Sequence, residues 1–232
     1  MLPRFSFERP MKRLFFPLLL GIGGCAILIW LCLWQVQRLE WKEGILAEID
    51  SRISGPAAPL DAVLSRDDPE WWLTEVSGAW QAVEPLRVLV TVEGIGPAYR
   101  LIQPFDVAGG PSLLIDRGVV PADFPIPTAT GTATVTANYR TPEEVDGFTP
   151  APEGTLWFAR DAAAMAEALG TEPHLLILRT VSPEDPAVTP LPVDTSTISN
   201  DHLEYAITWA LLAGVWAVMS GLLIWRTIKR RG

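Results

Sequence analysis

The chain has 232 residues and a net charge of −9, and 49% of its residues are hydrophobic, which is high for a soluble protein. The hydrophobic residues gather in two runs without Asp, Glu, Lys or Arg, Leu14 to Trp34 and Tyr205 to Trp225. Each run is long enough to cross a bilayer as a helix, in which every backbone group is satisfied within its own segment. The acidic balance argues against nucleic-acid binding, which requires basic surfaces. The sequence therefore predicts a membrane protein.

Basic residues flank both runs on the sides toward the chain ends. They are Arg4, Arg9, Lys12 and Arg13 before the first run, and Arg226, Lys229, Arg230 and Arg231 after the second. Residues 1–34 carry +3 and residues 205–232 carry +4, which leaves −16 for residues 35–204. Lys and Arg beside membrane spans stay in the cytoplasm. We therefore predict cytoplasmic ends at 1–13 and 226–232, spans at 14–34 and 205–225, and one extracytoplasmic domain at 35–204.

Both cysteines, Cys25 and Cys32, lie in the first run, so the outer domain has no disulfide framework. Their spacing of seven places them on one helix face, where two thiols could bind a metal, although simple packing is the favoured interpretation. The segment Ile22-Gly23-Gly24-Cys25 resembles a lipoprotein cleavage box. The chain stays apolar over residues 26–31, however, and this favours a spanning helix over a cleaved signal.

Beyond the first run, apolar residues keep helical spacing from Val36 to Ile53, so the membrane helix is expected to extend outward until Gly55-Pro56. A further short helical stretch is expected at 59–66. From Trp71 onward, short runs rich in Val, Thr, Ile and aromatic residues alternate with Gly and Pro, which is typical of strands. The predicted strands are 74–82, 86–93, 99–105, 112–116, 133–139 and 174–181.

One later segment, residues 161–169, is rich in helix formers, begins at a capping Asp161 and ends at Gly170. Loops are expected at 125–127 and 182–192. The predicted fold class is two transmembrane α-helices flanking a β-rich α+β extracytoplasmic domain, which at about 170 residues is long enough to bury its own core.

Motifs of known catalytic chemistry are missing from the sequence, which has no phosphate-binding loop, dinucleotide fingerprint, zinc motif or nucleophile elbow. His174 begins an apolar strand and is best explained as a core histidine. Carboxylate pairs such as Glu143-Glu144 and Glu184-Asp185 fit a solvated surface better than an acid–base pair. Arg117 and Arg140 end predicted strands, where each could hold an anionic group such as a propionate or form a structural ion pair. We expect no enzymatic activity.

The start of the second run joins a helix cap to a histidine. Three residues suit the N-cap: Ser199, Asn200 and Asp201. His202 is therefore expected in the first helical turn, at the outer membrane surface. Aromatic residues follow it at steps of three, seven and fourteen, on the face predicted to be shared: Tyr205, Trp209 and Trp216. An imidazole above such rings could bind the iron of a haem. The residues alone favour an ordinary aromatic belt at the lipid headgroups, with a merely polar histidine.

Three segments carry a resemblance that covers nearly the whole chain. The first is Trp34-Gln35-Val36-Gln37-Arg38-Leu39-Glu40-Trp41-Lys42, and the second is Leu113-Leu114-Ile115-Asp116-Arg117-Gly118-Val119-Val120-Pro121. The third is Asn200-Asp201-His202-Leu203-Glu204-Tyr205-Ala206-Ile207-Thr208-Trp209. They resemble, in order, the three signatures of the surfeit-locus-one family of cytochrome c oxidase assembly factors. Two positions depart from the family pattern, which has Asn at Asp116 and Trp at Val119.

The resemblance implies a non-enzymatic assembly factor for cytochrome c oxidase that assists delivery of haem a to oxidase subunit one, alongside haem A synthase. It implies His202 as ligand of the haem iron. Tyr205 and Trp209 would then be walls, and Arg38 and Arg117 would be propionate partners. The alternative is a haem-independent scaffold that binds an assembling oxidase subunit. The short N-terminal end favours a bacterial plasma membrane, with the outer domain in the periplasm.

Overall fold

The structure is a computed structural model that describes residues 9–196 and 198–229. Three basic residues of the predicted cytoplasmic ends lie outside this part of the chain: Arg4, Arg230 and Arg231. The chain divides into two compact units. We call residues 1–47 with 196–232 the helical unit, and residues 48–195 the β domain.

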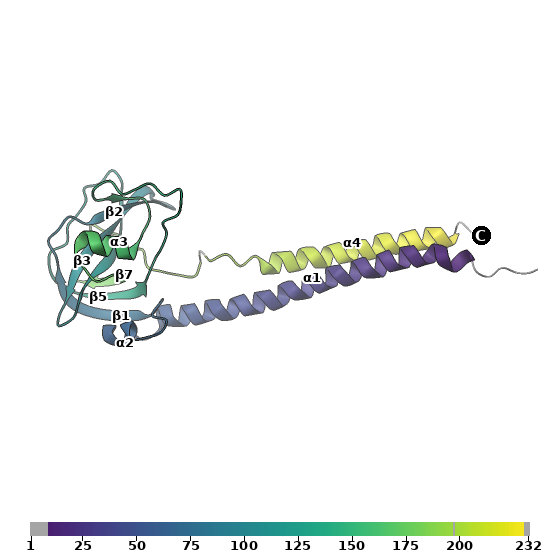
Figure 1. The fold of residues 1–232 in the computed structure, drawn as a ribbon, viewed down its shortest axis with the longest axis horizontal. Coiled ribbons are helices and arrows are strands. Elements are labelled where there is room, and N and C mark those ends of the chain that lie inside the picture. The colour runs from purple at the N-terminus through teal and green to yellow at the C-terminus, as the bar shows by residue number, and fades with distance from the viewer. Residues whose placement is uncertain (1–8, 197, 230–232) are drawn as a thin grey trace, which may run out of the picture. The chain divides into compact units, whose positions relative to one another are not determined.

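The helical unit contains most of helix α1 (Arg9–Ser54) and all of helix α4 (His202–Lys229), which run side by side (Figure 1). Both are long and apolar enough to cross a membrane. The predicted spans at 14–34 and 205–225 lie inside them. The predicted extension of the first helix beyond its apolar run is confirmed, since α1 continues to the residue before Gly55.

The less exposed positions of α4 recur at alternating steps of four and three residues, as in a coiled-coil seam. They are His202, Ala206, Trp209, Ala213, Trp216 and Ser220. Matching positions of α1 include Gly21, Gly24, Leu28, Leu31 and Gln35. Small residues on such seams let the backbones of two membrane helices approach closely.

Trp216 occupies the space that Gly24 leaves open. A Cβ built on Gly24 would lie 2.2 Å from Nε1 of Trp216, which donates a hydrogen bond to the carbonyl oxygen of Leu20 at 3.2 Å. A Cβ on Gly21 would similarly meet Ser220 at 3.0 Å. The two helices therefore have complementary surfaces, with glycine on α1 facing larger side chains on α4.

The β domain contains seven strands and two short helices. The strands are β1 (Leu73–Trp80), β2 (Leu86–Val92), β3 (Gly96–Val107), β4 (Ser112–Pro121), β5 (Gly131–Arg140), β6 (Leu156–Trp157) and β7 (Leu175–Ser182). The helices are α2 (Leu60–Leu64) and α3 (Ala162–Leu169). The strand order is β1-β5-β7-β4-β3-β2-β6, and an additional β1–β3 pairing closes the sheet. The predicted fold class is confirmed.

Alternate residues of the central strand β4 enter two different hydrophobic clusters, because successive side chains of a strand point to opposite faces. Leu113 and Ile115 join the cluster that contains Trp80 and Phe105. Leu114 joins the cluster in which α3 packs Met165 against the sheet. The strand is therefore buried on both sides, which explains its continuous apolar run.

The helix predicted at 161–169 forms as α3, for the local reasons that its sequence indicates. Asp161 is the N-cap, and its carboxylate accepts a hydrogen bond from the backbone N–H of Ala164 at 3.0 Å. Gly170 ends the helix in the left-handed conformation, with φ of 68°. The predicted short helix at 59–66 is confirmed as the five-residue α2.

Arg117 does not end a strand, as predicted from its sequence, but lies in the middle of β4 with only 2% of its surface exposed. Its guanidinium donates hydrogen bonds to Gln103 Oε1 at 2.7 Å and to the carbonyl oxygen of Pro127 at 2.6 Å, and it pairs closely with Asp185. Asp185, expected on a solvated surface, is therefore an ion-pair partner. A buried guanidinium is stable only when its donors are satisfied in this way.

The neighbouring Asp116 is fully buried as well. Its carboxylate accepts from Arg100 at 2.7 Å and from Arg160 at 3.4 Å. Arg160 also pairs with Glu144 at 2.5 Å. Burial alone would favour the neutral acid, but the hydrogen bonds and charge of Arg160 hold the pKa of Glu144 below its usual value. Asp116 thus belongs to a satisfied ionic network, and Glu144 joins that network from the exposed surface predicted for it.

Gly24→Ala is expected to loosen the packing of α1 against α4, because the added methyl overlaps the Trp216 indole; overpacking of this kind costs about 1–3 kcal/mol. Gly23→Ala is the matched control, since a Cβ there meets no heavy atom within 4 Å. Cys25, whose Sγ lies 4.0 Å from the Ala213 carbonyl oxygen, reports separation of the helices. In a Cys32→Ser background in micelles, alkylation of Cys25 should be about fivefold or more faster in Gly24→Ala. Equal rates in the two variants would contradict the packing.

Arg117→Met is expected to destabilise the β domain by about 3–5 kcal/mol, because it leaves Asp185 and two other acceptors without their donor. The control is Arg66→Met, at an exposed arginine that stacks on Trp72 and should contribute about 1 kcal/mol or less. Urea unfolding of the full chain in micelles, followed by pulse proteolysis, measures both. If the Arg117 variant is as stable as the wild type, the contacts of Arg117 do not stabilise the β domain as we infer.

Candidate functional site

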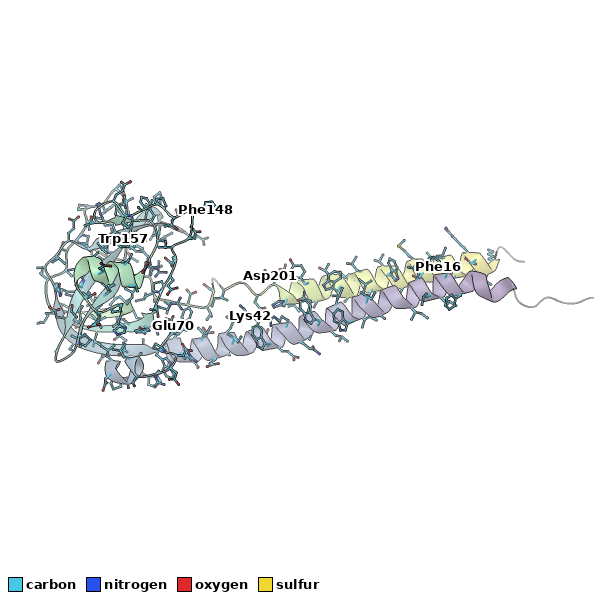
Figure 2. All side chains as sticks on the ribbon, in the orientation of Figure 1. Phe16, Lys42, Glu70, Phe148, Trp157 and Asp201 are labelled. Atoms are coloured by element: carbon cyan, nitrogen blue, oxygen red, sulfur yellow. The ribbon has the colours of Figure 1, made fainter. Side chains whose placement is uncertain are left out.

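His202 is the first residue of α4, as the capping pattern predicts. Asp201 immediately precedes the helix (Figure 2), and its carbonyl oxygen accepts a hydrogen bond from the Tyr205 backbone N–H at 3.2 Å. The Asp201 carboxylate accepts a hydrogen bond from Ser199 Oγ at 2.6 Å. Two polar residues thus order the chain just before the histidine and give the imidazole a defined position in the first helical turn.

Gln35 of α1 binds the imidazole of His202. Its Oε1 lies 2.8 Å from Nδ1 of His202, although 167 positions separate the two residues in the sequence. The Gln35 residue is only 8% exposed. Within the part of the chain that the structure describes, Nε2 of His202 has no hydrogen-bond partner. The first and third sequence motifs therefore meet at one polar contact that leaves a ring nitrogen available.

Asn200 contributes a second available polar atom two residues before His202. Its Oδ1 is buried and, among the residues that the structure describes, has no hydrogen-bond partner. A buried carbonyl without a partner costs about 1–3 kcal/mol. Four other buried side-chain atoms of the described residues, all in the β domain, also lack a partner, and a bound group that donates a hydrogen bond would satisfy the carbonyl of Asn200.

The three aromatic residues of the predicted stripe do not all lie on one face of α4. Trp209 is half-buried on the same seam of α4 as His202, two helical turns farther along. Trp216 lies deeper on that seam and packs over Gly24. Tyr205 is 55% exposed and lies beside the seam. Trp209 is therefore the aromatic residue of the stripe that shares the His202 face near the helix start.

Arg38 lies one helical turn beyond Gln35 on α1 and is exposed. Its guanidinium carbon lies 3.7 Å from the centroid of the Trp41 ring, a cation–π contact. Among the described residues, no carboxylate lies within salt-bridge distance of Arg38. The guanidinium is consequently held by stacking while its hydrogen-bonding edge stays available to an anion.

The other two arginines considered from the sequence belong to the β domain. Arg117 has its donors engaged by Gln103, Pro127 and Asp185. Arg140 pairs with Glu70 at 3.0 Å and stacks over Trp71 at 3.7 Å. Both make the structural ion pairs that were the alternative interpretation of their position. A role of Arg117 toward a propionate stays a prediction.

His174, the second histidine of the chain, makes a different contact. Its Nδ1 lies 2.9 Å from the hydroxyl oxygen of Tyr139 in the β domain. Burial lowers the pKa of His174, so the neutral ring is favoured there. The described residues contain no group of three or more His, Cys, Asp or Glu arranged to hold a metal ion. A metal at His202 would thus need most of its ligands from elsewhere.

The sequence patterns give Gln35 no role beyond its place in a motif, and they indicate Asn200 only as a helix cap. A signal for Gln35 was present. A carboxamide directly after an apolar membrane span, in a helix that continues, is expected to face a polar partner on another helix. The identity of that partner depends on how α1 packs against α4, which no local pattern contains.

Comparisons with known proteins agree with the three motifs. A SURF1-like protein of Drosophila melanogaster is 27% identical over 223 residues, which cover 85% of this chain and 73% of the fly protein. Surfeit locus protein 1 of Rattus norvegicus is 28% identical over 223 residues, covering 85% of this chain and 71% of the rat protein. The human protein of that name is 28% identical over 204 residues, covering 76% and 67%. A model of the SURF1 family matches residues 23–214, and the chain therefore belongs to the SURF1 family.

Proposed function

We propose that this chain assists cytochrome c oxidase assembly by holding haem a at the outer boundary of the membrane on its way to oxidase subunit one. The observation that supports it best is the state of His202, whose Nδ1 is engaged by Gln35 while Nε2 has no partner among the described residues. A single histidine is a poor site for a free metal ion. It suffices as an axial ligand, because the porphyrin supplies the other nitrogens.

The residues around His202 fit a haem in three further respects. The unpartnered Oδ1 of Asn200 can accept a hydrogen bond from a bound group. Arg38 has an available guanidinium edge for a propionate. Trp209 offers an aromatic surface, and the exposed Tyr205 offers a second one at the side of the seam. When bound, haem a supplies the iron centre and the anionic propionates; the chain supplies position, one ligand and a counter-charge.

The proposed location is a bacterial plasma membrane with both chain ends in the cytoplasm. The charge pattern supports the orientation of the chain ends: Arg226 and Lys229 lie in the last turns of α4, and the acidic residues concentrate between the two membrane spans. In this orientation, His202 lies near the outer surface and the β domain lies in the periplasm. The partners would be oxidase subunit one and haem A synthase, and the role would be non-enzymatic.

His202→Ala is expected to abolish stoichiometric haem in protein purified from cells that make haem A, because it removes the axial ligand. His174→Asn, at the other histidine, is the matched control and should keep the wild-type haem content. Visible spectra of the reduced proteins, together with extracted haem per chain, measure the difference. Equal haem content in His202→Ala and the wild type would reject the ligand assignment.

Association with oxidase subunit one separates haem delivery from a haem-independent scaffold. If the chain delivers haem a, copurification of subunit one with it should fall several-fold in cells that lack haem A. In cells that make haem A, the His202→Ala variant should show the same loss. The comparison requires equal amounts of both proteins in the membrane, measured by immunoblot. Undiminished copurification in both cases would favour the scaffold.

A further inference from the structure

We propose that Gln35 is a positioning residue that fixes the tautomer of His202, so that its Nε2 is presented as the free ligand nitrogen. This inference rests on the proposed haem-binding function for its purpose, but the tautomer itself can be measured without haem. It assigns a role to the first sequence motif, and it links that motif to the third one by a single hydrogen bond.

The chemistry of the contact sets the position of the proton. The atom of Gln35 that faces the ring is the carboxamide oxygen, at 2.8 Å from Nδ1 of His202. A carboxamide oxygen only accepts hydrogen bonds, so Nδ1 must be the donor. In a neutral imidazole, a proton on Nδ1 leaves the lone pair on Nε2. Gln35 therefore selects the ring form whose outer nitrogen can bind iron.

The position of Gln35 in α1 makes this contact a persistent one. Gln35 lies on the seam of α1, where only 8% of its surface is exposed, and the facing seam of α4 continues from His202 into Ala206. A carboxamide in such surroundings loses about 1–3 kcal/mol if it stays unpaired. Few other polar groups compete for it, since the adjoining seam positions Leu28 and Leu31 are apolar.

An acceptor on the distal nitrogen of a ligating histidine also changes the strength of the ligand. It orients the ring and raises the basicity of the nitrogen that binds the metal, and losing such a partner typically lowers metal affinity about 10–100-fold. Hydrogen bonding to the axial ligand is likewise a determinant of haem reduction potential. Gln35 should therefore affect haem affinity and potential without contacting the haem.

The first experiment measures the tautomer directly, in haem-free full-length protein in micelles, by ¹⁵N NMR of labelled histidine. The chain contains only two histidines, so His174→Asn leaves a single imidazole to observe. We expect the Nδ1–H tautomer in the wild-type background and in Gln35→Glu, which keeps an acceptor. In Gln35→Leu, the Nδ1–H tautomer should no longer be the major form. An Nε2–H tautomer in the wild type, or identical signals with and without Gln35, would overturn the proposal.

The second experiment titrates haem into the same proteins. Gln35→Leu should weaken haem binding about tenfold or more and raise the reduction potential, because a less basic imidazole stabilises ferric iron less well. Gln35→Glu should lower the potential below that of the wild type, because an anionic acceptor makes the imidazole a stronger donor. Gln37→Leu is the matched control, at an exposed position of the same helix, and should change neither quantity.

The outcomes distinguish this inference from the proposed function. If His202→Ala binds haem as well as the wild type, the ligand assignment fails, whereas the NMR result still decides the tautomer. If His202→Ala loses haem but Gln35→Leu and Gln35→Glu keep the wild-type affinity and potential, the positioning role fails alone. A merely structural role of Gln35 would not shift the potential in opposite directions in the two variants.

Discussion

Close packing of α1 against α4 is the constraint on which the candidate site depends. In lipid, two apolar helices gain little from hydrophobic burial against each other, so close packing holds them and polar contacts add only a small contribution. Glycine on α1 supplies the shape, because Trp216 fills the space above Gly24. Gln35 supplies the polar contact at the other end of the seam. The same packing therefore brings together two motifs that lie at opposite ends of the sequence.

The buried charged side chains of the β domain are paired with other groups of the same domain. Arg117, Asp116 and Arg160 are all largely buried, and each is engaged by opposite charges or carbonyl oxygens of the domain itself. These buried charges are therefore compensated within the β domain itself. Near His202, by contrast, one ring nitrogen and the Asn200 Oδ1 have no hydrogen-bond partner among the described residues, and Arg38 has no acidic one. The surroundings of His202 are thus distinguished by an imidazole nitrogen and an arginine edge that no described residue engages.

Local patterns predicted most of the fold, because helix length, strand periodicity and caps are encoded in neighbouring residues. The prediction that Arg117 ends a strand is wrong because Asp116 and Arg117 interrupt an apolar run, a pattern typical of a strand end. In β4 their charges are compensated by residues distant in the sequence. The strand β6 has two residues, which is too short for a periodicity. The cap and the spacing predict correctly that His202 lies in the first turn of a helix. The contact of His202 with Gln35 was not predicted, since only the packing of α1 against α4 brings the two residues together.

A polar pair in an apolar helix seam is not needed for stability. Two apolar residues of similar size could pack at these positions, and interhelical hydrogen bonds in membranes contribute only about 0.6 kcal/mol on average. Removing one partner alone is costly, so the pair persists once present, but this does not explain why a histidine lies there. A ligand role does explain it. Both nitrogens of the imidazole then have a function: Nδ1 orients the ring against Gln35, and Nε2 stays free at the start of α4.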